Sequence, residues 1–128
     1  MTALKKPLVF IVEDNDAYRL LIGRILEKKG YMVLLFEHGR KAAEMLQYLT
    51  PSVILSDIEM PCMDGFEFHE YVQKFHGSKN IPFIYLSSTS RKKDKKKALQ
   101  LSTNEMLEKP ISAVNLARAI EEVLDVTP

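Results

Sequence analysis

The sequence is poor in the residues that build disulfide scaffolds, transition-metal sites and membrane spans. Its single cysteine, Cys62, excludes a disulfide within the chain and is typical of a reducing compartment, so we expect a cytoplasmic protein. The three histidines, His38, His69 and His76, lack the paired spacing of a zinc site, and we expect the last two on a helix surface. No segment approaches the roughly 18 consecutive apolar residues of a membrane span, and residues 1–7 do not read as a signal peptide. These absences favour a protein without a membrane partner.

Charge is balanced over the whole chain but not along it. The net charge is +1, yet residues 91–97 hold six cations and one anion, a local +5, which leaves −4 for the remainder. A solvated helix face is the simpler interpretation of this basic segment, and docking of an acidic partner is the alternative. Direct binding of nucleic acid is disfavoured because no aromatic residues lie among the lysines.

Short apolar segments alternate with helical periodicity along all 128 residues, a length typical of one domain. Five such alternations predict an α/β fold with a doubly wound, five-stranded parallel sheet in the order 2-1-3-4-5 and helices on both faces. We expect strands at residues 8–12, 31–36, 53–56, 81–86 and 105–108. The helices are indicated by apolar stripes at Tyr18, Leu21, Ile22, Ile25 and Leu26, at Ala42, Met45, Leu46 and Leu49, at Phe68, Tyr71, Val72 and Phe75, and at Leu116, Ile120, Val123 and Leu124, with a weaker, lysine-rich helix at 91–101.

Polar residues follow four of the predicted strands. Glu13 and Asp14 come after the first, Asp57 after the third, Ser87 after the fourth and Lys109 after the fifth. The carboxyl ends of parallel strands lie on one rim of the sheet, where open α/β sheets form their sites. We therefore expect these five residues to form one site.

Three carboxylates on one rim predict a site for a divalent cation. Two carboxylates about 5 Å apart repel by roughly 3 kcal/mol at an effective dielectric constant near 20, and a cation offsets that cost. Hard oxygen ligands favour Mg²⁺, completed by water and a phosphoryl oxygen. Asp57 is the candidate nucleophile toward phosphorus, Asp14 with Glu13 is better placed to hold the metal, and Lys109 and Ser87 supply a positive charge and a hydroxyl for phosphoryl oxygens.

At these residues the chain resembles the receiver domain of two-component response regulators, from Leu8 to about Leu124. The family pattern is an acidic pair after the first strand, Asp-x-x-Met-Pro-x-Met-Asp-Gly after the third, Ser/Thr after the fourth and Lys-Pro after the fifth. In this sequence they are Glu13-Asp14, Asp-Ile-Glu-Met-Pro-Cys-Met-Asp-Gly at 57–65, Ser87 and Lys109-Pro110. The acidic pair and the Lys-Pro pair are weak signals on their own, but the ordered set at the strand ends is very specific.

The resemblance implies a single flavodoxin-like receiver domain over residues 1–128. Asp57 would accept a phosphoryl group from a histidine kinase or a histidine phosphotransfer protein, and slow self-hydrolysis would end the signal. Mg²⁺ would be held by Asp14, Asp57, the main-chain carbonyl of Glu59, and Glu13 either directly or through water. The Lys109–Pro110 peptide would be cis. Such a protein is a signalling switch and not an enzyme acting on external substrates.

The sequence departs from the family at the residues that, in most receivers, change position on phosphorylation. Most receivers carry Tyr or Phe three residues before the lysine, and that ring moves inward with the Ser/Thr, here Ser87. The position is occupied by Met106, which has neither ring nor hydroxyl. The usual Gly-Ala before the fifth strand is Ser102-Thr103, and Ser88 replaces the usual alanine.

Two other functions remain open. A degenerate receiver would keep the fold as a phosphorylation-independent interaction module. An aspartyl-phosphate hydrolase is disfavoured, because its Asp-x-Asp motif follows the first strand and usually comes with a cap domain. As an output surface we expect the face formed by residues 91–101, 105–108 and the last helix, which would take a second copy of the chain or an acidic partner.

Overall fold

The predicted parallel sheet is present with the predicted strand order. The computed structural model describes residues 6–77, 80–88, 96 and 105–124. Five parallel strands lie in the order β2-β1-β3-β4-β5. Their bounds are Leu8–Val12 (β1), Met32–Phe36 (β2), Val53–Asp57 (β3), Phe83–Ser87 (β4) and Glu105–Glu108 (β5).

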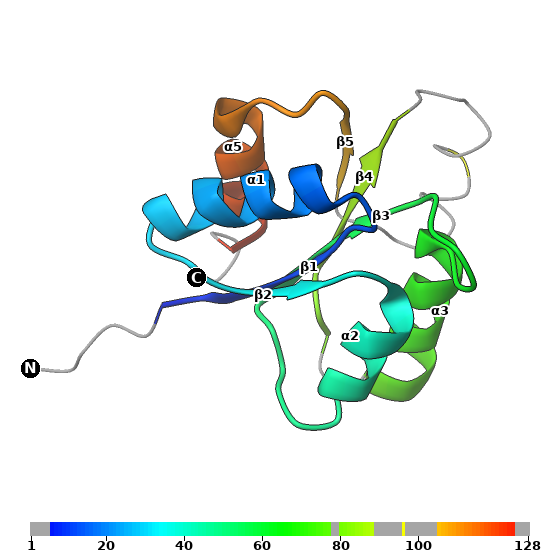
Figure 1. Ribbon diagram of the computed structural model, residues 1–128. Helices are drawn as coiled ribbons and strands as arrows, with labels where there is room; N and C mark the ends of the chain where they lie inside the picture. The colour runs from blue at the N-terminus through cyan, green and yellow to red at the C-terminus, as the bar shows by residue number, and fades with distance from the viewer. Residues whose placement is uncertain (1–5, 78–79, 89–95, 97–104, 125–128) are drawn as a thin grey trace, which may run out of the picture.

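Helices cover both faces of this sheet (Figure 1). Helix α1 (Asp16–Lys28) and helix α5 (Ala113–Leu124) lie on one face, and α2 (Gly39–Met45) and α3 (Gly65–His76) lie on the other. The helix expected at 91–101 falls, apart from Lys96, outside the described residues, as do Ser102 and Thr103.

The core consists of two layers, one on each side of the sheet. Strands β3 and β4 are buried at every position, and β1 at all but its first, because helices shield both of their faces. Alternate residues of each strand enter opposite layers, so Phe10, Ile54 and Tyr85 pack toward α2 and α3. Edge strand β2 is less protected and exposes Met32 and Leu35.

Local signals explain where α1 and α3 begin. The side chain of Asn15 accepts a hydrogen bond from the Tyr18 N–H at 2.9 Å and caps α1. Helix α3 begins with a capping box, in which Asp64 and Glu67 each accept a backbone N–H from the other. Asn15 directly follows Glu13 and Asp14, and Asp64 lies in the loop that follows Asp57. The segments that begin these two helices therefore also carry the acidic residues of the predicted site.

The predicted helix faces are wrong at five positions. Leu21, Leu49 and Phe75 are exposed, whereas His69 and His76 are buried. His69 stacks on Phe83 with ring centroids 4.0 Å apart and hydrogen-bonds the Tyr85 hydroxyl through Nδ1 at 2.8 Å. The expectation of surface histidines on α3 is therefore wrong. The face of α3 that packs on the sheet includes His69 and leaves out Phe75. Helix α2 also ends earlier than its stripe predicted, at Met45.

Candidate functional site

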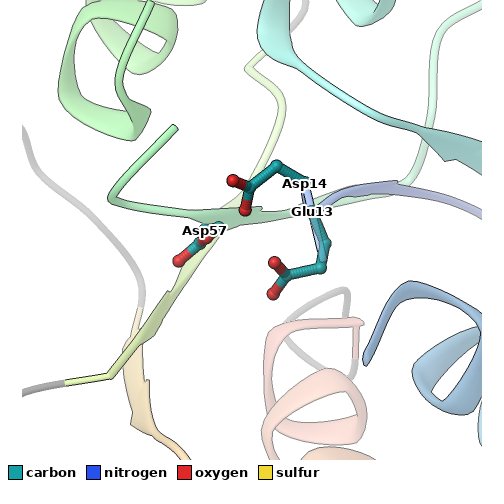
Figure 2. A group of neighbouring side chains, drawn as sticks. All are labelled: Glu13, Asp14 and Asp57. Atoms are coloured by element: carbon teal, nitrogen blue, oxygen red, sulfur yellow. The ribbon is translucent and has the colours of Figure 1, made fainter. Parts of the chain in front are cut away.

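The three predicted carboxylates meet at the carboxyl ends of β1 and β3. Glu13 and Asp14 follow the last residue of β1, and Asp57 is the last residue of β3. Figure 2 shows the three side chains approaching one another, and one oxygen from each lies within 4.8 Å of the others. Glu13 and Asp57 are buried, and Asp14 is exposed. The cluster therefore has a buried inner side and an outer side that opens to solvent.

Lys109 directly follows the edge strand β5, and its side chain reaches the carboxylates of the cluster. Its Nζ lies 2.6 Å from Oε1 of Glu13 and 3.5 Å from Oδ1 of Asp57. Its side chain is only 12% exposed, so these ion pairs are shielded from water. The Lys109 N–H donates to the Ser87 carbonyl at 2.6 Å, and the Lys109–Pro110 peptide is cis, as the resemblance implied. Lys109 is thus held by a backbone hydrogen bond and by the ion pairs of its side chain.

Glu13 is held by the protein on every side. Its Oε2 accepts the Asn15 N–H at 3.0 Å, while Oε1 faces Lys109. Its carbonyl accepts a hydrogen bond from Arg19 at 2.9 Å, and its N–H donates to Phe36 at 3.0 Å. Both carboxylate oxygens of Glu13 are therefore engaged, whereas Asp14 lies at the open side of the cluster.

The electrostatics of the cluster work against a charged Asp57. Its pKa is raised to about 7, chiefly by burial and then by the charge of Glu13, while Lys109 lowers it. Burial lowers the pKa of Lys109, but its contacts with Glu13 and Asp57 outweigh this and leave the pKa raised. One ammonium does not balance three carboxylates. An all-oxygen donor set with surplus negative charge fits a hard divalent cation such as Mg²⁺.

The remaining predicted residues lie around this cluster. Ser87 ends β4 and is buried, and the register pairs Asp57 with its neighbour Leu86. Glu59 is exposed two residues beyond Asp57. Met106 is half-buried in β5, directly across from Tyr85. The structure thus brings Glu13, Asp14, Asp57 and Lys109 into contact range, and it leaves the Met106 side chain in the apolar layer beneath.

A glycine keeps the start of α3 close to Asp57. The Gly65 N–H donates to the Ile58 carbonyl at 2.7 Å. A Cβ at position 65 would lie 2.3 Å from the Asp57 carbonyl oxygen, nearer than any real contact. The Asp-Gly pair of the motif therefore has two local tasks, since Asp64 caps the helix and Gly65 allows its close approach.

Three residues of the site were not predicted from sequence as part of it. Asn15 and Arg19 bind Glu13, and the ring of Tyr18 lies over Lys109 with Nζ 4.8 Å from its centroid. Their shared signal is position, because all three fall at the start of the helix that follows the acidic pair. Cap and stripe analysis assigned Asn15 and Tyr18 to the folding of that helix alone.

Comparisons with known proteins give one consistent result. A family model described as the response regulator receiver domain matches residues 9–121. An uncharacterized 14.6 kDa protein of Leptolyngbya boryana is 30% identical over 95% of this chain and 93% of its own length. The sensor histidine kinase CheAY of Helicobacter pylori is 32% identical over 89% of this chain, which spans only 14% of that kinase. The structure of chemotaxis protein CheY4 of Vibrio cholerae has a TM-score of 0.88 at 28% identity, covering 94% of this chain and all of that one.

The same comparisons span proteins of very different size, from one of similar length to a kinase of which this chain covers 14%. Among the residues that the structure describes, no helix is long and apolar enough to cross a bilayer.

Proposed function

Because the chain belongs to the family of response regulator receiver domains, we propose that it is a two-component signalling switch phosphorylated on Asp57. The observation that carries this proposal is the buried Asp57 carboxylate with the ammonium of Lys109 3.5 Å away. The phosphoryl donor is the phosphohistidine of a histidine kinase or of a histidine phosphotransfer protein. Residues 1–128 act as one receiver domain in this reaction.

Mg²⁺ is the proposed cofactor, held by the side chains of Asp14 and Asp57 and by the main-chain carbonyl of Glu59. Glu13 is assigned a contact through water, because Lys109 and the Asn15 N–H already engage its two carboxylate oxygens. When bound, the ion offsets the negative charge of the carboxylates and of the incoming phosphoryl oxygens. The all-oxygen cluster of Glu13, Asp14 and Asp57 supports this choice of metal.

The reaction transfers the phosphoryl group from nitrogen to oxygen. A carboxylate oxygen of Asp57 attacks phosphorus, the N–P bond breaks, and the histidine leaves with its electron pair. Lys109 stabilises negative charge on the phosphoryl oxygens, and Ser87 donates its hydroxyl to one of them. Water later attacks phosphorus of the acyl phosphate, which returns the Asp57 carboxylate and releases inorganic phosphate. The phosphoryl acceptor in this chemistry is the protein's own side chain.

The proposed switch connects Ser87 to strand β5 and helix α5. Ser87 lies in register with Glu108, and Met106 lies two residues earlier on the same strand. Arg118 of α5 forms an ion pair with Glu105 of β5 at 3.0 Å, which joins helix and strand at the surface, and a second one within the helix with Glu122 at 3.0 Å. We assign this face to a second copy of the chain or to an acidic partner, with Met106 acting through packing in place of the usual aromatic ring.

The test is intact mass after incubation with phosphoramidate or acetyl phosphate and Mg²⁺. We expect one added phosphoryl group on the wild type and none on Asp57→Asn. The matched control is Asp16→Asn. Asp16 is an exposed aspartate, and an asparagine oxygen at this position can still accept the hydrogen bond from Arg19. This control should be phosphorylated like the wild type.

Failure of the wild type with these donors is followed by a phosphorylated histidine donor protein. No adduct from either donor type would refute the proposal and favour a phosphorylation-independent interaction module. An adduct that survives Asp57→Asn would refute Asp57 as the acceptor.

A further inference from the structure

The aromatic ring of Tyr18 lies over Lys109, the cation that forms ion pairs with the carboxylates of Glu13 and Asp57. The Lys109 Nζ is 4.8 Å from the Tyr18 ring centroid, within the range of a cation–π contact. Glu13 contacts the same ammonium, so Lys109 lies between a ring face and the carboxylates. Because the Lys109 side chain is 12% exposed, little water competes with either contact.

The Tyr18 backbone is linked to the site through Asn15 and Glu13. The Tyr18 N–H donates to Oδ1 of Asn15 at 2.9 Å, and the Asn15 N–H donates to Oε2 of Glu13 at 3.0 Å. Glu13 Oε1 in turn meets Lys109 at 2.6 Å. Glu13, Asn15, Tyr18 and Lys109 therefore form a closed ring of contacts, and the Tyr18 side chain also packs on the apolar layer between the sheet and helices α1 and α5.

We propose that Tyr18 is a positioning residue for phosphoryl transfer at Asp57, holding the Lys109 ammonium at the site through its ring face. This inference rests on the proposed function. In the structure Lys109 is closer to Glu13 than to Asp57, 2.6 Å against 3.5 Å, and the reaction requires its charge beside Asp57. A hydrogen bond is directional, but attraction to a ring face changes little over a small lateral shift. Tyr18 therefore allows Lys109 to move toward a phosphoryl oxygen while it remains desolvated and confined.

The test compares variants that keep or remove the ring. Tyr18→Phe keeps the aromatic face, whereas Tyr18→Leu and Tyr18→Met keep an apolar side chain without it. The first readout is the NMR signal of the Lys109 ε-methylene protons, identified by its loss in Lys109→Met. The ring face shifts this signal upfield, so we expect the shift in the wild type and Tyr18→Phe and its loss in the other two variants.

The second readout is the initial rate of phosphorylation by phosphoramidate with Mg²⁺. From the usual strength of a shielded cation–π contact, we expect roughly three- to tenfold slower phosphorylation of Tyr18→Leu and Tyr18→Met and a near wild-type rate for Tyr18→Phe. Urea denaturation of all three variants separates this effect from global stability, and a variant that does not fold is replaced by the other ring-free variant.

Equal rates in the wild type and in both ring-free variants would overturn this inference alone. Equal slowing of Tyr18→Phe and Tyr18→Leu would also overturn it, because the ring would then have no role of its own. A wild type that is never phosphorylated would overturn the proposed function and this inference with it, and the Asp57→Asn comparison identifies that case.

Discussion

Neutralising Asp57 should stabilise the protein when no divalent cation is present. Asp57 is buried beside Glu13, and its pKa is raised from 3.8 to about 7, chiefly by burial. Above pH 7 the folded protein must therefore hold a carboxylate that its surroundings disfavour, whereas the unfolded chain solvates it freely. Asp57→Asn removes the charge and keeps a side chain of nearly the same shape.

The sign and size of the effect follow from proton linkage. Between the unfolded pKa of 3.8 and the folded pKa of about 7, the folded state binds more protons, so stability falls as pH rises through this range. At about 1.4 kcal/mol per pH unit, the carboxylate costs up to about 4 kcal/mol at pH 8 and about 2 kcal/mol at pH 5. We expect Asp57→Asn to gain stability of this order, and to gain more at pH 8 than at pH 5.

Magnesium should reduce this difference by stabilising the wild type. A ligand present at 100 times its dissociation constant stabilises the folded state by about 2.7 kcal/mol. Asp57→Asn loses one of the proposed charged ligands, so added Mg²⁺ should raise its stability much less. The gap between variant and wild type should therefore narrow in excess Mg²⁺.

Urea denaturation followed by circular dichroism measures all of these quantities. The wild type, Asp57→Asn and the exposed control Asp16→Asn are compared in EDTA at pH 8 and pH 5, and again with excess Mg²⁺ at pH 8. If Asp57→Asn is no more stable than the wild type at pH 8 in EDTA, the argument from buried like charges is wrong. If the gain does not shrink at pH 5, its cause is not the ionisation of Asp57.

Three further substitutions test other parts of the fold. Burial lowers the pKa of His69 to about 4, so the unfolded state binds more protons between pH 6.5 and 4. From pH 7 to 5, denaturation should show the wild type losing about 2 kcal/mol more than His69→Phe, which keeps the stack on Phe83; parallel losses would contradict this. Cys62 has a φ of 71°, in the left-handed region that asparagine tolerates best. Cys62→Asn should raise the free energy of unfolding by about 0.5–1 kcal/mol over Cys62→Ser, and equal values would count against local strain. Gly65→Ala should cost about 1–3 kcal/mol and slow phosphorylation, because its Cβ would meet the Asp57 carbonyl; a fully active, equally stable variant would show that the loop adapts freely.

The location of the site was predictable because topology and strand order together determine it. Glu13, Asp57, Ser87 and Lys109 each lie at or just beyond the end of a strand, and parallel pairing brings those ends to one rim. The prediction needed only apolar segments and their order. The strand ends could be placed because the register of each strand is constrained: a slip of one residue would turn each buried side chain to the opposite face.

The burial of His69 was not predictable from the periodicity of α3. The pattern places Phe75 inside and the histidines outside, because it assigns exposure from the polarity of each residue. In the structure Phe75 is 59% exposed and His69 is 3% exposed. The hydroxyl of Tyr85, sixteen positions away in sequence, supplies the partner that makes a buried imidazole acceptable. Helix periodicity carries no information about a partner on a distant strand.

The different burial of the two residues of the acidic pair was also not predictable from the sequence. Glu13 is buried against Lys109, while the adjacent Asp14 is exposed. Three carboxylates, one ammonium and one Mg²⁺ sum to a formally neutral site.

Phosphorylation changes that balance, since it replaces the single charge of Asp57 with about two charges on the phosphoryl group. The modified site then holds about one surplus negative charge, which the fixed cations alone do not neutralise. Hydrogen-bond donors must supply the difference, and Ser87 is a hydroxyl-bearing residue buried at the adjacent strand end. We therefore propose that site electrostatics draw this neutral donor toward the phosphoryl group, whether or not an aromatic side chain occupies position 106. On this proposal, Met106 changes how the movement reaches the surface and leaves its electrostatic cause in place.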